Sequence, residues 1–288
     1  MSAVGAKPGG SAGIDPVASV VAIVLMIIML GIMYMLVGTS MEFMALVGIV
    51  IGGILIGFGV MFVPVGGAPA AMGQAPGIAT GVAMLAAGAG LAGLFGGAWA
   101  AQTTSNLLVI VVTGAVGGGL MMAITCLFVN FIYVYGMGIP AASGKVKKDP
   151  ITGDTQTEYK SQGTEGHGLP FVSYVGGVIG GIFGGAGGTL IYVMLLGVYK
   201  ESLPAMMQAQ SGQLLPIPAA QIMPIAVTLA GMFAIGLFLV NAVLAAYNIT
   251  GTIEGPHDPK FKRWPRAVIA SATASALVGL VAIMIVAL

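Results

Sequence analysis

The sequence predicts an all-α integral membrane protein, a glycine-rich bundle of helices that crosses the bilayer about seven times. Three observations predict this class. Of the 288 residues, 58% are apolar and only 7% are charged, whereas soluble domains carry about 25% charged residues. The apolar residues form runs of roughly 20 or more, the length that a helix needs to span the hydrocarbon core. Many of the 47 glycines lie inside these runs, where small residues let helices approach closely in lipid.

The first apolar run, Val17–Val37, follows Asp15-Pro16, which is a typical helix start. This run is too long for the apolar region of a signal peptide and no clear cleavage site follows it, so we expect a span. Six more spans are expected further along the chain: Met44–Val63, Gly77–Ala101, Leu107–Tyr135, Phe171–Val198, Gln221–Ala246 and Ala267–Leu288. The predicted organisation is an amino-terminal extension with one span, residues 1–43, followed by a six-span membrane domain, residues 44–288.

The basic residues predict the orientation. Two charged loops, residues 136–170 and 247–265, are separated by two spans and therefore lie on the same side of the bilayer. With seven spans, Lys7 shares that side, and Lys200 alone among the ten basic residues lies on the other. Because Lys and Arg are enriched in cytoplasmic loops, we expect both charged loops and the amino terminus in the cytoplasm. The predicted location is the cell membrane.

Several classes of function are excluded or disfavoured. The formal net charge of +1 gives no basic surface for nucleic acid. No Asp, Glu, Lys, Arg or His lies deep within a predicted span, whereas proton pumps keep an ionisable group there. No set of residues for nucleophilic catalysis or phosphate binding is present, so we expect no catalytic residue in this chain. The single cysteine, Cys126, is expected to be a small buried apolar residue.

The polar groups that remain in the spans are mainly neutral oxygens. Asn130 and Asn241 occur in the similar contexts Leu-Phe-Val-Asn and Phe-Leu-Val-Asn, near the same end of two spans, and Asn248 follows one of them. Amide and carbonyl oxygens are hard ligands that suit small alkali cations. For either Asn alone, an interhelical hydrogen bond is the simpler interpretation.

The predicted cytoplasmic loops hold two similar stretches, each with a Glu and a His a few residues apart. The first contains Glu165 and His167, and the second contains Glu254, His257 and Asp258. Such groups at a membrane entrance could gather a cation or bind a partner. A third loop on this side is uncharged and rich in Pro and Gly, which prevent a continuous helix. Its low polarity suggests burial against protein or a shallow re-entrant path; its main members are Pro64, Gly66 and Gly67.

A glycine stripe is predicted on the span Phe171–Val198. Its members repeat every four residues: Gly176, Gly180, Gly184 and Gly188. This spacing places them on one face of a helix, where they form a groove for a neighbouring helix. Whether that neighbour belongs to this chain or to another subunit stays open.

Four stretches resemble a known family. They are Phe62–Met72, Asp149–Gly153, Gly163–Pro170 and Asn248–Arg263, and the similarity extends in the same order over about Leu46–Leu288. They resemble the D subunit of the membrane-bound tetrahydromethanopterin S-methyltransferase of methanogenic archaea. Residues 1–43 precede the usual start of that family.

The resemblance implies a complex that transfers a methyl group from methyl-tetrahydromethanopterin to coenzyme M and couples this step to sodium export. It implies a cobamide on a partner subunit, and polytopic C and E subunits as partners in the membrane. This chain would then be a non-catalytic subunit with Na+ as the only candidate ion. The ion-path candidates are Asn130, Asn241, Asn248, Glu165 and Glu254.

Two other interpretations stay open. The chain could be a structural scaffold that only packs partner subunits, with the glycine stripe as its contact surface. It could also be an independent secondary transporter, because six core spans divide into two halves of three and the paired Glu/His stretches suggest related halves.

Overall fold

The computed structural model describes residues 16–62, 77–131, 135, 171–211, 218–249 and 264–287. These residues form seven helices and no strand, which confirms the predicted class of helical membrane bundle. In chain order the helices are α1 (Pro16–Val37), α2 (Met41–Val60), α4 (Gly77–Thr103), α5 (Leu107–Phe131), α6 (Phe171–Ser211), α7 (Ala219–Ile249) and α8 (Trp264–Ala287).

Every apolar run that the sequence singles out is a helix. Six of the seven helices are long and apolar enough to cross a membrane, and α4 is not one of these six. The span expected over Gly77–Ala101 is therefore confirmed as a helix, while its passage through the bilayer stays a prediction.

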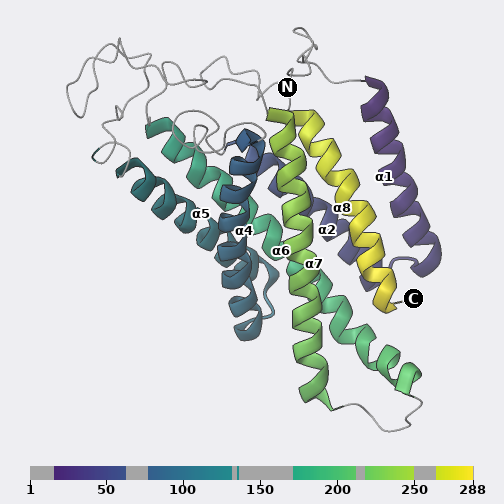
Figure 1. The fold of residues 1–288 in the computed structure, drawn as a ribbon. Coiled ribbons are helices and arrows are strands. Elements are labelled where there is room, and N and C mark those ends of the chain that lie inside the picture. Colours follow the sequence, from purple (N-terminus) through teal and green to yellow (C-terminus); the bar gives the residue numbers. More distant parts are fainter. Residues whose placement is uncertain are drawn as a thin grey trace, which may run out of the picture.

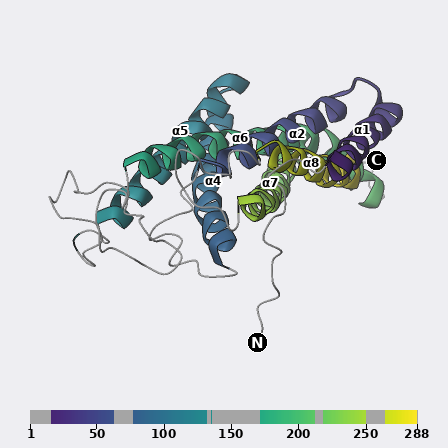
Figure 2. The same cartoon turned by 90° about the horizontal axis from the view of Figure 1, so that it is seen from above.

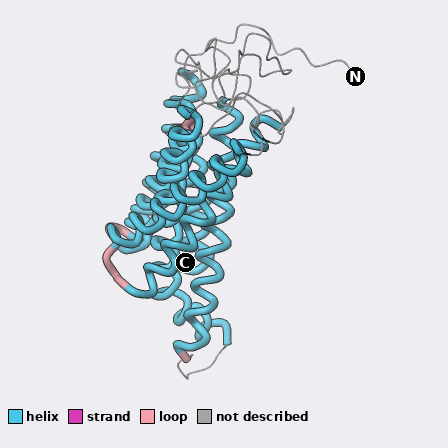
Figure 3. The backbone as a smooth tube through the Cα atoms, turned by 90° about the vertical axis from the view of Figure 1, so that its left-hand side faces the viewer, coloured by secondary structure: helices cyan, strands magenta, loops and turns pink. Residues whose placement is uncertain are grey.

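Successive helices run in alternating directions (Figure 1). The first residues of α1, α4, α6 and α8 and the last residues of α2, α5 and α7 lie at one end of the bundle. Seen from the side, the helices share one general direction (Figure 3). This alternation is what a chain that crosses a membrane repeatedly requires, and it agrees with the predicted arrangement of the charged loops.

Helix α6 is the central element of the bundle. It packs against α2, α4, α5, α7 and α8, whereas the main contacts of α1 among the described residues are with α8 and α2. Viewed from above, α1 and α5 lie at opposite ends of the bundle with α6 between them (Figure 2). The bundle is therefore built around α6, and α1 is its most peripheral helix.

Short turns join α1 to α2 and α4 to α5 at the other end of the bundle. Between α1 and α2, Gly38 has a φ of +66°, a conformation that favours glycine. Ser40 then caps α2 by accepting a 3.5 Å hydrogen bond from the amide of Phe43. Before α5, the Asn106 side chain accepts a 3.0 Å bond from the amide of Leu108. The Ser40 cap explains why α2 begins three residues before the apolar run that the sequence indicates.

Helix α6 runs beyond Val198, where the fifth predicted span ends. Helix α6 continues to Ser211 and carries Lys200, Glu201 and Pro204 within it. Lys and Glu are good helix formers, so the charged pair ends the apolar run without ending the helix. The sequence pattern therefore located the end of the apolar segment and not the end of the helix.

Candidate functional site

Three buried polar side chains lie on α7 and α8, two of them in direct contact and the third one helical turn away. Asn241 of α7 and Ser271 and Ser275 of α8 each have no exposed surface. The amide nitrogen Nδ2 of Asn241 donates a 2.8 Å hydrogen bond to the Ser275 hydroxyl. Ser271 and Ser275 are four residues apart and so lie one turn apart on the same face of α8. We call these three side chains the oxygen cluster.

Two glycines of α2 make room for the oxygen cluster. A Cβ at Gly53 would overlap the Ser275 hydroxyl and lie 2.9 Å from Nδ2 of Asn241, while a Cβ at Gly57 would overlap the Ser271 hydroxyl. Gly53 and Gly57 are also one turn apart, so they match the two serines across the helix interface. The backbone of α2 therefore forms the third wall of the cluster.

Two oxygens of the cluster have no hydrogen-bond partner among the described residues. They are Oδ1 of Asn241 and Oγ of Ser271, and both are buried. An unpaired buried polar group costs about 1–3 kcal/mol relative to a paired one. Neutral oxygens that are buried away from bulk solvent can accept a hydrogen bond from an ordered water or bind a hard cation.

Two other buried hydroxyls, those of Thr189 and Tyr199, have hydrogen-bond partners. The Thr189 hydroxyl on α6 donates to the carbonyl of Gly93 at 3.0 Å, and the Tyr199 hydroxyl donates to the carbonyl of Ala282 at 2.9 Å. Like the cluster, Thr189 faces glycines that make room for it, Gly97 and Gly114. The unpaired oxygens are therefore a local property of the oxygen cluster and not a general property of this packing.

Aromatic rings lie at the end of the bundle nearest to the oxygen cluster. Phe58 contacts Trp264 with ring centroids 6.1 Å apart and Phe183 with centroids 5.2 Å apart. Phe62 stacks on Phe183 at 6.0 Å. At a rise of about 1.5 Å per residue, Ser271 lies roughly 10 Å along α8 from Trp264. The rings pack at that end of the α2–α6–α8 interface, and Trp264 is 46% exposed there.

The structure places only one predicted ion-path residue in a described environment, Asn241. Asn130 lies in α5 and Asn248 in α7, but their side chains are outside the described set. The remaining candidates lie outside the described residues: Glu165, Glu254, His167, His257, Asp258, Pro64, Gly66 and Gly67. Within the described part of the chain, no three His, Cys, Asp or Glu side chains gather where they could bind a metal ion.

Sequence reasoning missed Ser271 and Ser275. Serine is common in membrane helices, and its hydroxyl often bonds to a carbonyl of its own helix, so neither residue stood out. Their four-residue spacing opposite two glycines of the same spacing, Gly53 and Gly57, is the signal that could have found them. The pairing of Ser275 with Asn241, 34 residues away in the chain, is tertiary and left no local pattern.

The glycine stripe of α6 packs inside this chain. A Cβ at Gly176 would lie 2.6 Å from the carbonyl oxygen of Phe62, and one at Gly188 would lie 3.1 Å from the Phe238 ring. Gly184 faces the same ring at 3.3 Å, and the carbonyl of Gly180 lies 2.8 Å from the Cβ position of Gly59. The open question about the neighbour of the stripe is thereby answered for these contacts, which go to α2, to Phe62 just beyond its end, and to α7.

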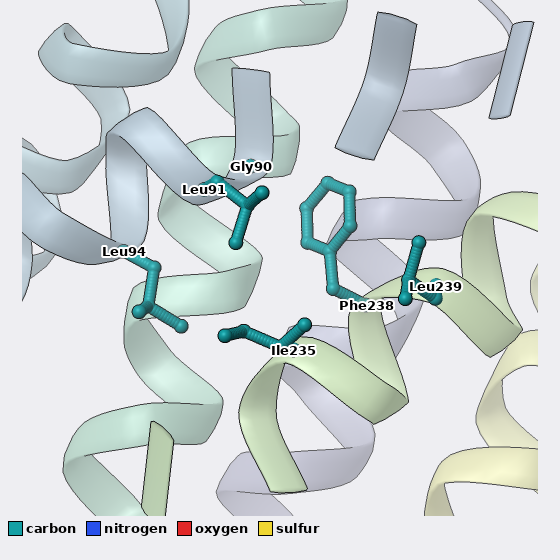
Figure 4. Close-up of a pocket in the computed structure, with 6 residues that line it drawn as sticks. All are labelled: Gly90, Leu91, Leu94, Ile235, Phe238 and Leu239. Carbon is teal, nitrogen blue, oxygen red and sulfur yellow. The ribbon is translucent and has the colours of Figure 1, made fainter. Parts of the chain in front are cut away.

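A small apolar cavity lies beside the ring of Phe238. Its volume is about 40 Å³, and Figure 4 shows its walls, which come from α4 and α7: Gly90, Leu91, Leu94, Ile235, Phe238 and Leu239. A cavity without polar lining stays dry, so it does not suggest a ligand. A larger hollow of about 400 Å³ lies where α4 ends, next to α6, and is lined by Gln102, Thr103, Thr104 and Lys200 among others.

These features define a class of protein: a multi-pass helical membrane protein with a buried cluster of neutral oxygens and no charged side chain among its buried described residues. Comparison with known sequences identifies the family. Residues 42–275 match the family of the D subunit of tetrahydromethanopterin S-methyltransferase, and the chain belongs to that family. Helix α1 precedes the matched residues.

Individual relatives carry the name of the same D subunit of tetrahydromethanopterin S-methyltransferase. The protein of Methanosarcina mazei is 51% identical over 245 residues, which are 84% of this chain and 94% of the relative. The protein of Methanothermobacter thermautotrophicus is 50% identical over 247 residues, which are 85% of this chain and 98% of the relative. The protein of Methanocaldococcus jannaschii is 42% identical over 245 residues, which are 84% of this chain and 96% of the relative.

Proposed function

We propose that this chain is a membrane subunit of a tetrahydromethanopterin S-methyltransferase complex and that it helps to form the path by which sodium ions leave the cell. The complex transfers a methyl group from methyl-tetrahydromethanopterin to coenzyme M, and its cobamide is carried by a partner subunit. This chain contributes no catalytic group. Its partners in the bilayer are the polytopic C and E subunits.

The observation that carries the proposal is the unpaired amide oxygen of Asn241. This oxygen is buried, and its own amide nitrogen is already engaged by Ser275. A neutral oxygen that is shielded from water and has a lone pair to offer can replace part of the hydration shell of an alkali cation. Asn241 makes the interhelical hydrogen bond to Ser275 that the simpler interpretation predicts, and its unpaired oxygen is what that bond leaves unexplained.

The orientation of the bundle fits export from the cytoplasm. The helix ends that flank the two Lys-rich segments lie at one end of the bundle (Figure 1), and the positive-inside rule places that end in the cytoplasm of the cell. Asn241 lies eight residues before the end of α7, which is about 12 Å from that end. The oxygen cluster is therefore expected in the half of the bundle that faces the cytoplasm.

One argument for the alternative that this chain is only a structural scaffold does not hold. It drew on the glycine stripe of α6 as a surface for other subunits, and the described contacts of Gly176, Gly184 and Gly188 are made within this chain. We propose that partner subunits instead bind the outward apolar face of α5, where Leu108, Val116 and Leu127 are all more than half exposed.

Sodium transport by the intact complex in vesicles tests the proposal. We expect Asn241→Ala to lower methyl-transfer-coupled uptake of radioactive sodium at least fivefold, because loss of one ligand to a charged group costs about 1.5–3 kcal/mol. Asn130→Ala and Glu254→Ala are expected to lower it as well. Thr189→Val, which removes a hydroxyl with a structural partner, is the matched control. Unchanged coupled uptake in all three variants, with normal subunit composition, would overturn the sodium-path role.

A further inference from the structure

We propose that the oxygen cluster is a binding site for one dehydrated monovalent cation of the size of Na+, with the hydroxyls of Ser271 and Ser275 and the amide oxygen of Asn241 as ligands from this chain. This inference deepens the proposed function, on which it rests, by naming two ligands on α8. The starting observation is that two buried oxygens from two helices, Asn241 Oδ1 and Ser271 Oγ, lack partners among the described residues of one interface.

The ligand set decides the class of ion. All three side chains are neutral, and none of the buried polar residues in the described structure is a carboxylate. A divalent cation is dehydrated only at a cost that anionic ligands must offset, and Ca²⁺ sites accordingly use several carboxylates. Neutral hydroxyl and amide oxygens match a monovalent ion with a smaller hydration energy. An anion is disfavoured because the atoms without partners are acceptors or hydroxyls and not cationic donors.

The helix geometry places the ligands within one turn of the α2–α8 interface. Ser271 and Ser275 point toward α2, where Gly57 and Gly53 leave the space that their oxygens occupy. Substitution of either glycine by a residue with a side chain would fill that space. The hydrogen bond between Asn241 and Ser275 holds the amide of α7 against the same interface. Two of the three ligands are thus in place before any ion arrives, and the third is one helical turn away, which lowers the ordering cost of binding.

A buried water is the competing occupant, and the two predict different responses to sodium. A water would satisfy the unpaired oxygens at any salt composition. A cation would stabilise the protein only when that cation is present, because a ligand that binds the folded state raises stability according to its concentration relative to Kd. The Ser271 hydroxyl should then be unfavourable without the ion, since it is an unpaired buried group.

The test measures sodium binding to the purified complete complex. Radioactive sodium is titrated at constant ionic strength, with choline as the replacing cation, and thermal unfolding is followed in parallel. We expect Ser271→Ala and Ser275→Ala to raise the sodium concentration for half-saturation at least tenfold. Ser271→Cys should act like Ser271→Ala, because it keeps a side chain of similar shape but replaces a hard oxygen with a soft sulfur. In choline alone, Ser271→Ala should unfold at an equal or higher temperature than the wild type.

Thr189→Val is the control for loss of a buried hydroxyl elsewhere, and it should leave the half-saturation concentration unchanged. Unchanged half-saturation in all the serine variants, or wild-type stability that does not depend on sodium, would overturn the site and indicate a bound water only. The two proposals fail separately. If sodium uptake depends on Asn241 while the serine variants bind sodium normally, the path stands and this ligand set is wrong. If the serine variants lose binding while coupled uptake persists, the ion is structural and the path lies elsewhere.

Discussion

At the scale of single residues, the surroundings of the missing Cβ separate two uses of glycine in this bundle. At Gly185 of α6, an added Cβ would lie 3.1 Å from the Cα of Gly118 and would overlap the carbonyl oxygen of Gly114. The obstacles belong to the backbone of α5, which cannot rotate away as a side chain can. At Gly231 and Gly236 of α7, nothing lies within 4 Å of an added Cβ. Gly185 therefore allows α5 and α6 to approach closely, whereas Gly231 and Gly236 take part in no such close approach among the described residues.

Paired alanine substitutions follow from this difference. Gly185→Ala should separate α6 from α5 and lower the free energy of unfolding by about 1–3 kcal/mol, the usual cost of overpacking. Gly231→Ala should be neutral or slightly stabilising, because alanine is the better helix former. Thermal unfolding of both variants in detergent would measure the contrast. Equal unfolding temperatures for the two variants would contradict the close approach of α5 and α6.

At the scale of helices, α6 and α1 represent opposite degrees of integration. Helix α6 packs against most of the other helices, and its buried residues include the satisfied hydroxyls of Thr189 and Tyr199. Helix α1 buries only Ser19, Met29 and Met33 among its residues. A polar link to α8 is the 3.1 Å bond from the Thr273 hydroxyl to the carbonyl of Ala22, although that hydroxyl also bonds within α8 at 2.9 Å. Helix α1 is therefore an addition to the packed bundle and not one of its central supports.

Removal of α1 tests this view. A chain that begins at residue 39, so that the Ser40 cap is retained, should still insert, and helices α2–α8 should remain packed, because no described residue of α4, α5, α6 or α7 makes an extended contact with α1. We expect only a small loss of stability from the packing contacts of Met29 and Met33, because lipid tails that replace α1 are as apolar as these side chains. Thr273→Val in the full chain measures how much the hydrogen bond from Thr273 to Ala22 contributes to stability, which we expect to be about 0.6 kcal/mol. Aggregation of the truncated chain in mild detergent would show that α1 supports the fold.

The elements differ in how far the sequence could predict them. All seven helices were predictable because a run of about 20 apolar residues has few other uses. The helix ends were harder to predict. Helix α2 begins at the Ser40 cap, before its apolar run, and α6 continues through Lys200 and Glu201, beyond its apolar run. Asn241 could be selected as a polar group in an apolar helix. The roles of Ser271 and Ser275 depend on contact with glycines of α2, and no pattern in the sequence around the serines indicates that contact.

At the scale of the whole molecule, the alternating helix directions and the positions of the basic residues together predict which end of the bundle faces the cytoplasm. The turn at residues 104–106 and the end of α6 lie at the end of the bundle opposite to the helix ends that flank residues 132–170 and 250–263 (Figure 1). Lys200, near the 400 Å³ hollow at the α4–α5 turn, is on that opposite side. The positive-inside rule therefore predicts that the hollow faces outward and that the oxygen cluster lies in the inner half of the bundle.

Single-cysteine labelling tests this sidedness. The native Cys126 is half-buried within α5 and would first be replaced by Ser. Cysteines are then introduced one at a time at Ser105, which is exposed in the α4–α5 turn, and at Lys148 in the charged segment. In right-side-out cells or vesicles, a membrane-impermeant maleimide should label the cysteine at 105 and spare the one at 148. Inverted vesicles should show the reverse, because the reagent then reaches the face that carries the lysines. Labelling of both positions from the same side would contradict this arrangement. It would mean that the chain crosses the bilayer an even number of times between residues 105 and 148, most simply because α5 does not span it. The placement of the oxygen cluster relative to the cytoplasm would then have to be reversed or abandoned.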